Sequence, residues 1–243
     1  MIACLAIVAL VAGCGRLGFD ASATDATATD VAIDAIGPPC PPLPGLLFCE
    51  SFEGDPLLPS VDGTVMIDAT RSARGARSQY AMTTGASVPS WQLGQVLPYV
   101  TSGELYARWY VWVPSTVQSI DLASVHLVEM TTPYDGVSFG VVDGIVEMEN
   151  TANDISMIAR STTRLPLDRW VCLQMHVAIS ATDGAIDVAV DGQTVAARSG
   201  LDTLPATGYR MVHAGLFAMD SATAPIEMWT DEVAVGTQPI PCD

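Results

Sequence analysis

Alternation of hydrophobic and polar residues along the chain predicts an all-β domain that begins at Cys40. Runs rich in Val, Tyr, Trp and Phe alternate with Gly, Asp, Pro and Ser clusters at intervals of roughly 8–15 residues, which is typical of a β-sandwich. No segment shows a sustained helical period flanked by caps. We expect antiparallel strands at 46–52, 64–68, 79–83, 103–113, 124–131, 136–142, 144–149, 155–160, 169–179, 185–190, 193–198, 209–219 and 226–235.

Asp-Gly pairs mark several of the expected turns. They occur at residues 135–136, 143–144, 183–184 and 191–192, each between two expected strands. Asp-Gly tolerates the positive φ angles that tight hairpin turns require. These pairs therefore favour antiparallel hairpins between neighbouring strands.

Residues 1–13 are apolar and uncharged, and we expect them to form a signal peptide. A membrane-spanning helix needs about 20 such residues, so this run is too short to be one. It ends in Leu-Val-Ala-Gly-Cys, which resembles the lipobox of bacterial lipoproteins and predicts that Cys14 is lipidated. Gly15 stands where aspartate signals inner-membrane retention in some bacteria, which favours the outer membrane. The alternative is an ordinary secretory leader with an incidental cysteine.

Residues 14–39 differ in composition from the rest of the chain. Alanine, threonine and aspartate dominate, and almost no large apolar side chain is available to bury. Such a segment cannot offset the entropy of ordering, so we expect a lipid-anchored, disordered linker. The folded β-sandwich domain is then expected at 40–243.

The chain is strongly acidic, with a formal net charge of −17 from 27 acidic and 10 basic residues. All the basic residues are arginine. Such a surface repels phosphate backbones, so nucleic acid is not an expected partner. We expect no cofactor, although loop carboxylates offer the oxygen ligands that calcium prefers, and these are Asp183, Asp187, Asp191 and Asp231.

The expected strand at 104–113 separates two sets of side chains. Its odd positions are apolar and predict a core face, whereas its even positions carry aromatic and charged groups. The even set could bind a ligand, because aromatic rings stack on sugars and arginine bonds hydroxyls or carboxylates. The other interpretation is that loops cover these side chains. The candidate ligand contacts are Tyr106, Arg108, Tyr110 and Trp112.

Four segments resemble the laminin-G-like and concanavalin A-like jelly rolls. They are the opening strand at 47–54, the segment LYARWYVWVPS at 105–115, the RWV and VAVDGQTV pieces at 169–171 and 188–195, and the closing strand at 229–235. The resemblance covers about residues 46–236. It implies two curved antiparallel sheets, a pairing of the first strand with the last, and a face that often binds glycans.

Four cysteines remain outside the leader, which suggests two disulfides in an exported protein. The resemblance implies that 48–52 runs antiparallel to 229–235, and in that register Cys40 lies opposite Cys242. We therefore expect Cys40–Cys242, which leaves Cys49–Cys172. No CxxC pair occurs and the three histidines are scattered, so we expect no zinc site.

Two short motifs resemble the jelly-roll alginate lyases. Gln174-Met175-His176 is similar to their Q-I-H motif, and Tyr209 to Gly215 is similar to Y-F-K-A-G, without its lysine. In that chemistry Gln and Arg neutralise the uronate carboxylate while His or Tyr removes a proton. The catalytic candidates implied are Arg108, Gln174, His176 and Tyr209. The R-[ST]-E-x-R motif of these lyases is not matched by the strand that carries Arg108.

Glu147 and Glu149 share one strand face, as the carboxylates of a retaining glycosidase would. The E-x-D-x-E pattern of concanavalin A-like glucanases is missing, so a solvated strand edge is the preferred interpretation. The expectation from the sequence is a non-catalytic module that binds carbohydrate or a surface protein. A polysaccharide lyase or glycoside hydrolase is the alternative, and a structural envelope protein without a ligand is the third hypothesis.

Overall fold

The computed structural model describes residues 40, 42–54, 64–83, 95–116, 125–128, 136–142, 144–152, 157–216 and 226–242. The predicted signal peptide, the lipidation site at Cys14 and the linker lie outside this part of the chain. Within it, no helix is long and apolar enough to cross a membrane.

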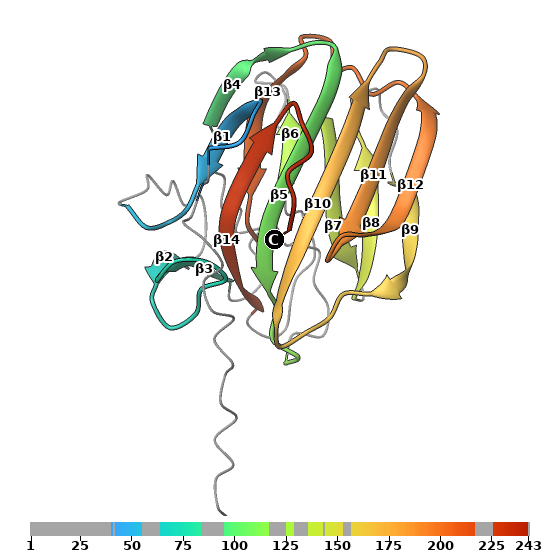
Figure 1. Cartoon of the computed structure of the whole chain (residues 1–243). Coiled ribbons are helices and arrows are strands. Elements are labelled where there is room, and N and C mark those ends of the chain that lie inside the picture. Colours follow the sequence, from blue (N-terminus) through green and yellow to red (C-terminus); the bar gives the residue numbers. More distant parts are fainter. Residues whose placement is uncertain are drawn as a thin grey trace, which may run out of the picture. The chain divides into compact units, whose positions relative to one another are not determined.

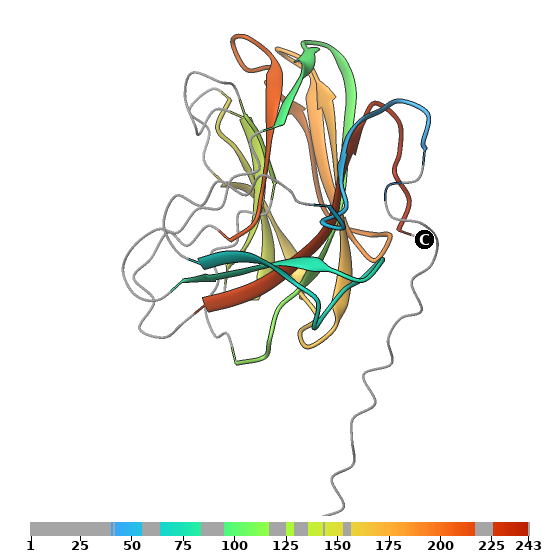
Figure 2. The same cartoon turned by 90° about the vertical axis from the view of Figure 1, so that its left-hand side faces the viewer.

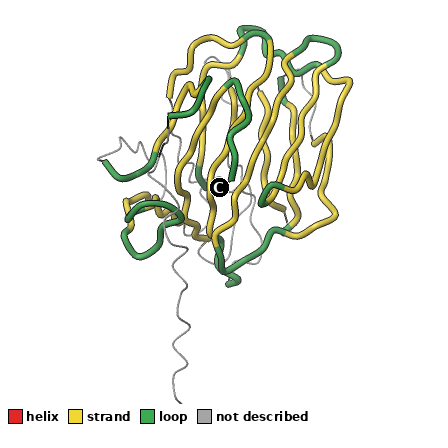
Figure 3. The backbone as a smooth tube through the Cα atoms, viewed as in Figure 1, coloured by secondary structure: helices red, strands yellow, loops and turns green. Residues whose placement is uncertain are grey.

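The described residues form strands and loops, without a helix (Figure 3). The strands are β1 (Leu46–Glu50), β2 (Thr64–Asp68), β3 (Ser78–Thr83), β4 (Gln95–Val100), β5 (Gly103–Trp112), β6 (Val125–Val128), β7 (Gly136–Val142), β8 (Ile145–Asn150), β9 (Met157–Arg164), β10 (Trp170–Ile179), β11 (Gly184–Val190), β12 (Gln193–Leu201), β13 (Tyr209–Ala214) and β14 (Ile226–Gly236). The all-β prediction is confirmed.

The strands form two antiparallel sheets that face each other (Figures 1 and 2). The larger sheet has the order β12-β11-β10-β5-β14-β3-β2, and β1 pairs with β14 beside this path. The smaller sheet has the order β4-β13-β6-β7-β8-β9. This arrangement is the sandwich that the sequence predicts.

The core lies between the two sheets and is filled by alternate residues of each strand. In β5 the odd positions are buried, as predicted, and β10 buries the positions opposite them; the main contributors are Leu105, Trp109, Val111, Leu173 and Met175. Residues Val146 and Met148 of β8 close the core from the smaller sheet. The other side of β5 and β10 forms what we call the outer face of the larger sheet.

Asp191 and Gly192 join β11 to β12 and have φ angles of 50° and 78°. The positive φ at consecutive residues is the geometry that Asp-Gly was expected to allow. The expected turn residues Asp135 and Asp143 lie outside the described part of the chain.

The predicted pairing of the first strand with the last is confirmed, but the predicted disulfide connectivity is wrong. β1 runs antiparallel to β14, with Leu46 opposite Gly236 and Cys49 opposite Ala234. The bonds are Cys40–Cys49 and Cys172–Cys242. The register between β1 and β14 does not continue to Cys40 and Cys242, because the chain turns back before β1 and leaves the sheet after β14.

After β14 the chain crosses the outer face of the larger sheet as a short segment, which we call the C-terminal strap (residues 237–242). The Gln174 side-chain amide donates to the Ile240 carbonyl at 2.7 Å, and Arg108 Nη1 donates to the Pro241 carbonyl at 3.0 Å. The Cys172–Cys242 disulfide fixes the end of the strap to β10. The strap therefore covers the middle of this face.

Candidate functional site

Five side chains form a lateral row at one end of the outer face. Each residue stands opposite the next in register, from β2 through β3, β14 and β5 to β10. We call this set the aromatic row, and its members are Met66, Tyr80, Trp229, Trp112 and Trp170. Directly opposite residues of antiparallel strands project to the same side of a sheet, so the row is continuous. With strands about 4.8 Å apart, it spans roughly 19 Å.

Contacts within the aromatic row fix its rings. The ring centroids of Tyr80 and Trp229 are 4.9 Å apart, and those of Trp112 and Trp170 are 6.0 Å apart. Trp170 and Trp229 are buried, whereas Tyr80 and Trp112 are half-buried and Met66 is 48% exposed. The row thus combines two anchored rings with three accessible side chains, which is a suitable platform for an apolar ligand face.

Two polar groups of the row donate hydrogen bonds to neighbouring carboxylates. The Tyr80 hydroxyl donates to Glu227 at 2.8 Å, and Trp229 Nε1 donates to Asp68 at 2.5 Å. Partial burial, with the bond to Glu227, raises the pKa of Tyr80 to about 12. Tyr80 is therefore neutral at physiological pH, and these hydrogen bonds hold the row in place.

Trp112 was a predicted ligand contact and belongs to this row, but two of its predicted companions are buried under segments that cover the outer face. Arg108 is 1% exposed and Tyr110 is also buried. The C-terminal strap, which contacts Arg108 through the Pro241 carbonyl, covers this part of the face. The prediction of exposed ligand contacts at Arg108 and Tyr110 is corrected accordingly, since covering segments occupy the second face of β5 at these positions.

Arg108 belongs to a buried charge cluster at a bulge in β14. It forms an ion pair with Glu232, which also lies 3.1 Å from Nε of Arg74. Asp231 accepts hydrogen bonds from the backbone N–H groups of Ala73 and Arg74 at 2.8 and 2.9 Å. Burial raises the pKa of Asp231 to about 7, against the opposing effect of these bonds. Removing one partner of a buried pair leaves an uncompensated charge and costs about 3–5 kcal/mol, so substitutions in this cluster should destabilise the fold.

A polar cluster lies on the other side of the strap, around His176. Its Nδ1 is 2.6 Å from Asp187, its Nε2 bonds Glu104, and its ring stacks on Tyr106 with centroids 4.6 Å apart. The hydrogen bond to Asp187 is the main cause that raises the pKa of His176, and partial burial opposes it. With a carboxylate at each ring nitrogen, the imidazolium form is favoured. His176 is therefore poorly suited to accept a proton as a general base.

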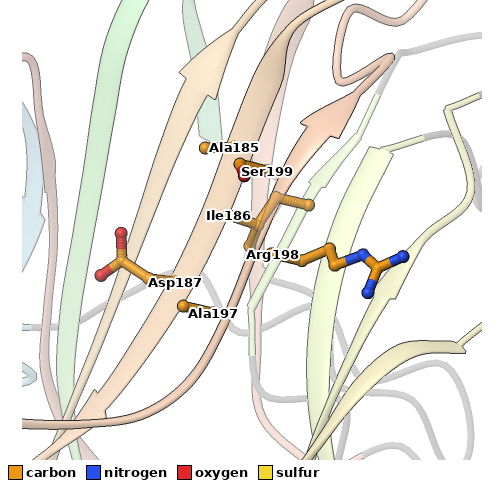
Figure 4. A pocket seen from close by; sticks show the side chains of 6 residues that line it. All are labelled: Ala185, Ile186, Asp187, Ala197, Arg198 and Ser199. Carbon is orange, nitrogen blue, oxygen red and sulfur yellow. The ribbon is translucent and has the colours of Figure 1, made fainter.

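A shallow depression of about 350 Å³ lies beside this cluster over β11 and β12. Small side chains form much of its lining, which comprises Ala185, Ile186, Asp187, Ala197, Arg198 and Ser199. Figure 4 shows that the side chains of Asp187 and Arg198 point in different directions. Ligand sites usually converge polar groups on one point, and this depression does not.

The catalytic candidates implied by the lyase motifs do not come together. Arg108 and Gln174 are opposite each other in register and His176 is nearby on β10, but Tyr209 lies on β13 of the other sheet. Tyr209 is fully buried, and its hydroxyl donates to the Thr203 carbonyl at 2.5 Å. Burial raises its pKa far above the usual value. Tyr209 has the surroundings of a core residue.

The smaller sheet brings the two remaining histidines together in register. His213 of β13 is opposite His126 of β6, His126 is opposite Ser138, and Ser138 is opposite Glu149. The Ser138 hydroxyl lies 3.5 Å from a Glu149 carboxylate oxygen. The sequence did not predict that the two histidines are neighbours, because 87 positions separate them and only the strand pairing brings them together. The two histidine side chains lie outside what the structure describes.

The carboxylates considered for catalysis or calcium binding have other partners, and Glu147 is buried on a strand inside the smaller sheet rather than on the solvated strand edge that we preferred. Glu147 forms an ion pair with Arg160, and Asp191 forms one with Arg169 at 2.6 Å. Asp187 bonds His176, and Asp231 is buried. Among the described residues, no group of three or more His, Cys, Asp or Glu side chains could hold a metal ion.

Known proteins resemble this chain in fold. The chain matches no family model and no curated protein sequence. It is similar to the crystal structure of an endo-β-1,4-glucuronan lyase from the fungus Trichoderma reesei, at 13% identity and a TM-score of 0.64, covering 79% of this chain and 95% of that one.

Two further solved structures share the fold. The cellulose-induced protein Cip1 matches at 15% identity with a TM-score of 0.57, over 81% of this chain and 100% of that one. An alginate lyase from a Chlorella virus, vAL-1, matches at 9% identity with a TM-score of 0.52, over 72% of this chain and 90% of that one. At these identities the similarity establishes the jelly-roll fold.

Proposed function

We propose that this chain is an exported lipoprotein whose jelly-roll domain binds carbohydrate through the aromatic row, without cleaving it. The observation that carries the proposal is the in-register line of four aromatic rings and Met66 on the outer face of the larger sheet. Two disulfides fit an extracytoplasmic location, because such bonds persist in oxidising compartments. The names of the fold neighbours, two polysaccharide lyases and a cellulose-induced protein, support a carbohydrate ligand.

Substitution of Trp112 by alanine tests the proposal. Trp112 is half-buried between Trp229 and Trp170 in the aromatic row, so its removal takes away much of the accessible aromatic surface of the row. We expect the Trp112→Ala variant to lose about tenfold or more of its affinity in binding assays on a panel of polysaccharides. The matched control is Tyr99→Ala, which removes a 59% exposed ring from β4 of the smaller sheet and should leave binding unchanged.

Met66→Ala separates a loss of binding from a loss of folding. Met66 is exposed at the end of the row, so its truncation should reduce affinity without lowering the melting temperature. Normal binding by both the Trp112 and Met66 variants contradicts the proposal. Arg108→Ala is unsuitable as a test, because it would leave the buried Glu232 carboxylate short of a partner.

A second candidate function is a polysaccharide lyase whose active site lies on the smaller sheet. The observation that favours it is the register of His213, His126 and Ser138, because neutral histidine is the commonest general base in proteins. The catalytic histidine would then belong to this row, while His176 remains between its two carboxylates.

This alternative is tested by incubating the protein with glucuronan and alginate. A lyase releases unsaturated uronates, which absorb in the ultraviolet, and His126→Ala or His213→Ala should abolish their release. The control variant His176→Ala should retain activity. Absence of unsaturated products with every polyuronate tested rejects the lyase and leaves the binding module.

A further inference from the structure

One guanidinium group lies against the aromatic row. Arg71, in the loop between β2 and β3, places its guanidinium carbon 4.5 Å from the ring centroid of Trp112 and 4.8 Å from that of Trp229. These rings are neighbours in the row, so the cation is shared between two π faces.

The Arg71 guanidinium has no hydrogen-bonding or ion-pair partner among the residues that the structure describes. Other arginines do have carboxylate partners. Arg74 and Arg108 share Glu232, and Arg169 pairs with Asp191. A chain with 27 acidic and only 10 basic residues offers many possible carboxylate partners. Guanidinium carries five N–H donors in a planar fork, and stacking on a ring leaves its edges accessible.

The loop that carries Arg71 is fixed by its backbone. The Arg71 carbonyl accepts a hydrogen bond from the Ser78 hydroxyl at 2.7 Å, and Ser78 is buried. Two residues further on, Asp231 binds the backbone N–H groups of Ala73 and Arg74. The guanidinium is therefore presented in advance of binding, which reduces the entropy that a ligand must overcome.

Two carboxylates lie near enough to feel the Arg71 charge, but each is held by other donors. Asp68 accepts from Trp229 and Thr70, and Asp168 accepts from the backbone N–H of Ser115. Partial burial of Asp68 is outweighed by its hydrogen bonds and by Arg71, so its pKa is lowered. The bonds from Ser115, with a smaller effect of Arg71, lower the pKa of Asp168. Neither carboxylate forms an ion pair with Arg71.

We propose that Arg71 binds the carboxylate of a uronic acid unit in an acidic polysaccharide. A carboxylate matches the fork of guanidinium with two parallel hydrogen bonds. The rings of Trp112 and Trp229 carry the guanidinium, and the half-buried ring of Tyr80, 4.9 Å from that of Trp229, continues the apolar surface for the attached sugar ring. This inference rests on the proposed function and assigns the ligand class of the same surface.

The test compares polygalacturonate with its carboxyl-reduced, neutral form and with a sulfated glucan, using the full chain in mild detergent. We expect wild type to bind polygalacturonate at least about tenfold more tightly than the neutral polymer. Arg71→Gln should abolish this preference, and Arg71→Lys should restore only part of it, because lysine keeps the charge without the fork. Arg198→Gln, which removes an exposed guanidinium from β12, is the control and should match wild type.

Each outcome has a distinct meaning. Failure to bind these polymers and every polysaccharide of the panel contradicts the proposed function as a whole. Equal affinity for both polymers, or an Arg71→Gln variant as good as wild type with an unchanged melting temperature, contradicts only the assignment of Arg71. Equal binding of the sulfated glucan shows that charge alone is recognised and overturns the carboxylate assignment.

Discussion

Individual side chains of β5 show how far alternation predicts function. The even positions were correctly separated from the core, yet Arg108 is buried while Trp112, four residues later, is half-exposed. Alternation assigns a side chain to one face of a sheet, but it does not indicate what covers that face. The covering segments here are the C-terminal strap and the loop after β2, which are distant in sequence and carry no periodic signal.

The His176 cluster predicts a pH dependence of stability. The pKa of His176 is raised in the folded state above the unfolded value near 6.5. The contribution of His176 to the free energy of unfolding is therefore fully present below the unfolded pKa and is lost as pH rises through the folded pKa. His176→Gln should therefore lower the free energy of unfolding more at pH 5 than at pH 9, by on the order of 1 kcal/mol or less. Urea unfolding at the two pH values measures this difference.

Tyr106→Phe is the matched control for that experiment. It keeps the ring that stacks on His176 but removes no group that titrates between these pH values. Its effect on stability should be the same at both. An equal loss at pH 5 and pH 9 for His176→Gln would show that folding does not raise the pKa of the imidazole.

At the level of strands, the sequence predicted thirteen of the fourteen observed elements. The missing strand is β4, whose Pro98 lacks a backbone donor and weakens the pattern. β4 lies at the edge of the smaller sheet, where proline is tolerated. The aromatic row was not predicted, because it combines residues from five strands, and lateral neighbours follow only from topology and register.

The two disulfides should contribute unequally to stability. Cys172–Cys242 closes a loop with a sequence separation of 70, against 9 for Cys40–Cys49. Loop-closure entropy predicts a loss of about 4 kcal/mol for the double Cys172→Ala, Cys242→Ala variant and about 2.5 kcal/mol for the other pair. Chemical denaturation of both variants measures the order. A larger loss from the Cys40–Cys49 pair would show that the C-terminal strap is held without its covalent link.

For the molecule as a whole, the acidic composition sets a condition on the ligand that we propose. A net charge of −17 repels anionic polymers at long range, so recognition of one would depend on a local cation on the surface. The proposed site at Arg71 satisfies that requirement.

Membrane attachment is expected to depend on a single thiol. If Cys14 is lipidated, Cys14→Ala should move the protein from the membrane to the soluble fraction, as measured by cell fractionation and detergent phase partition. Cys4→Ala changes the other leader cysteine and should leave the protein membrane-bound. Retention of the Cys14 variant in the membrane would reject the lipoprotein assignment.

If the domain is tethered on its N-terminal side and binds a polymer, as we propose, the Cys40–Cys49 bond has a mechanical consequence. A force applied from the N-terminal side acts on Cys40 and is transmitted through the disulfide bond to Cys49 within β1. The intervening residues, including the first part of β1, are bypassed and cannot be peeled from β14 one by one. Tension therefore enters β1 at Cys49, opposite Ala234 of β14, and the ladder between β1 and β14 resists it from that point.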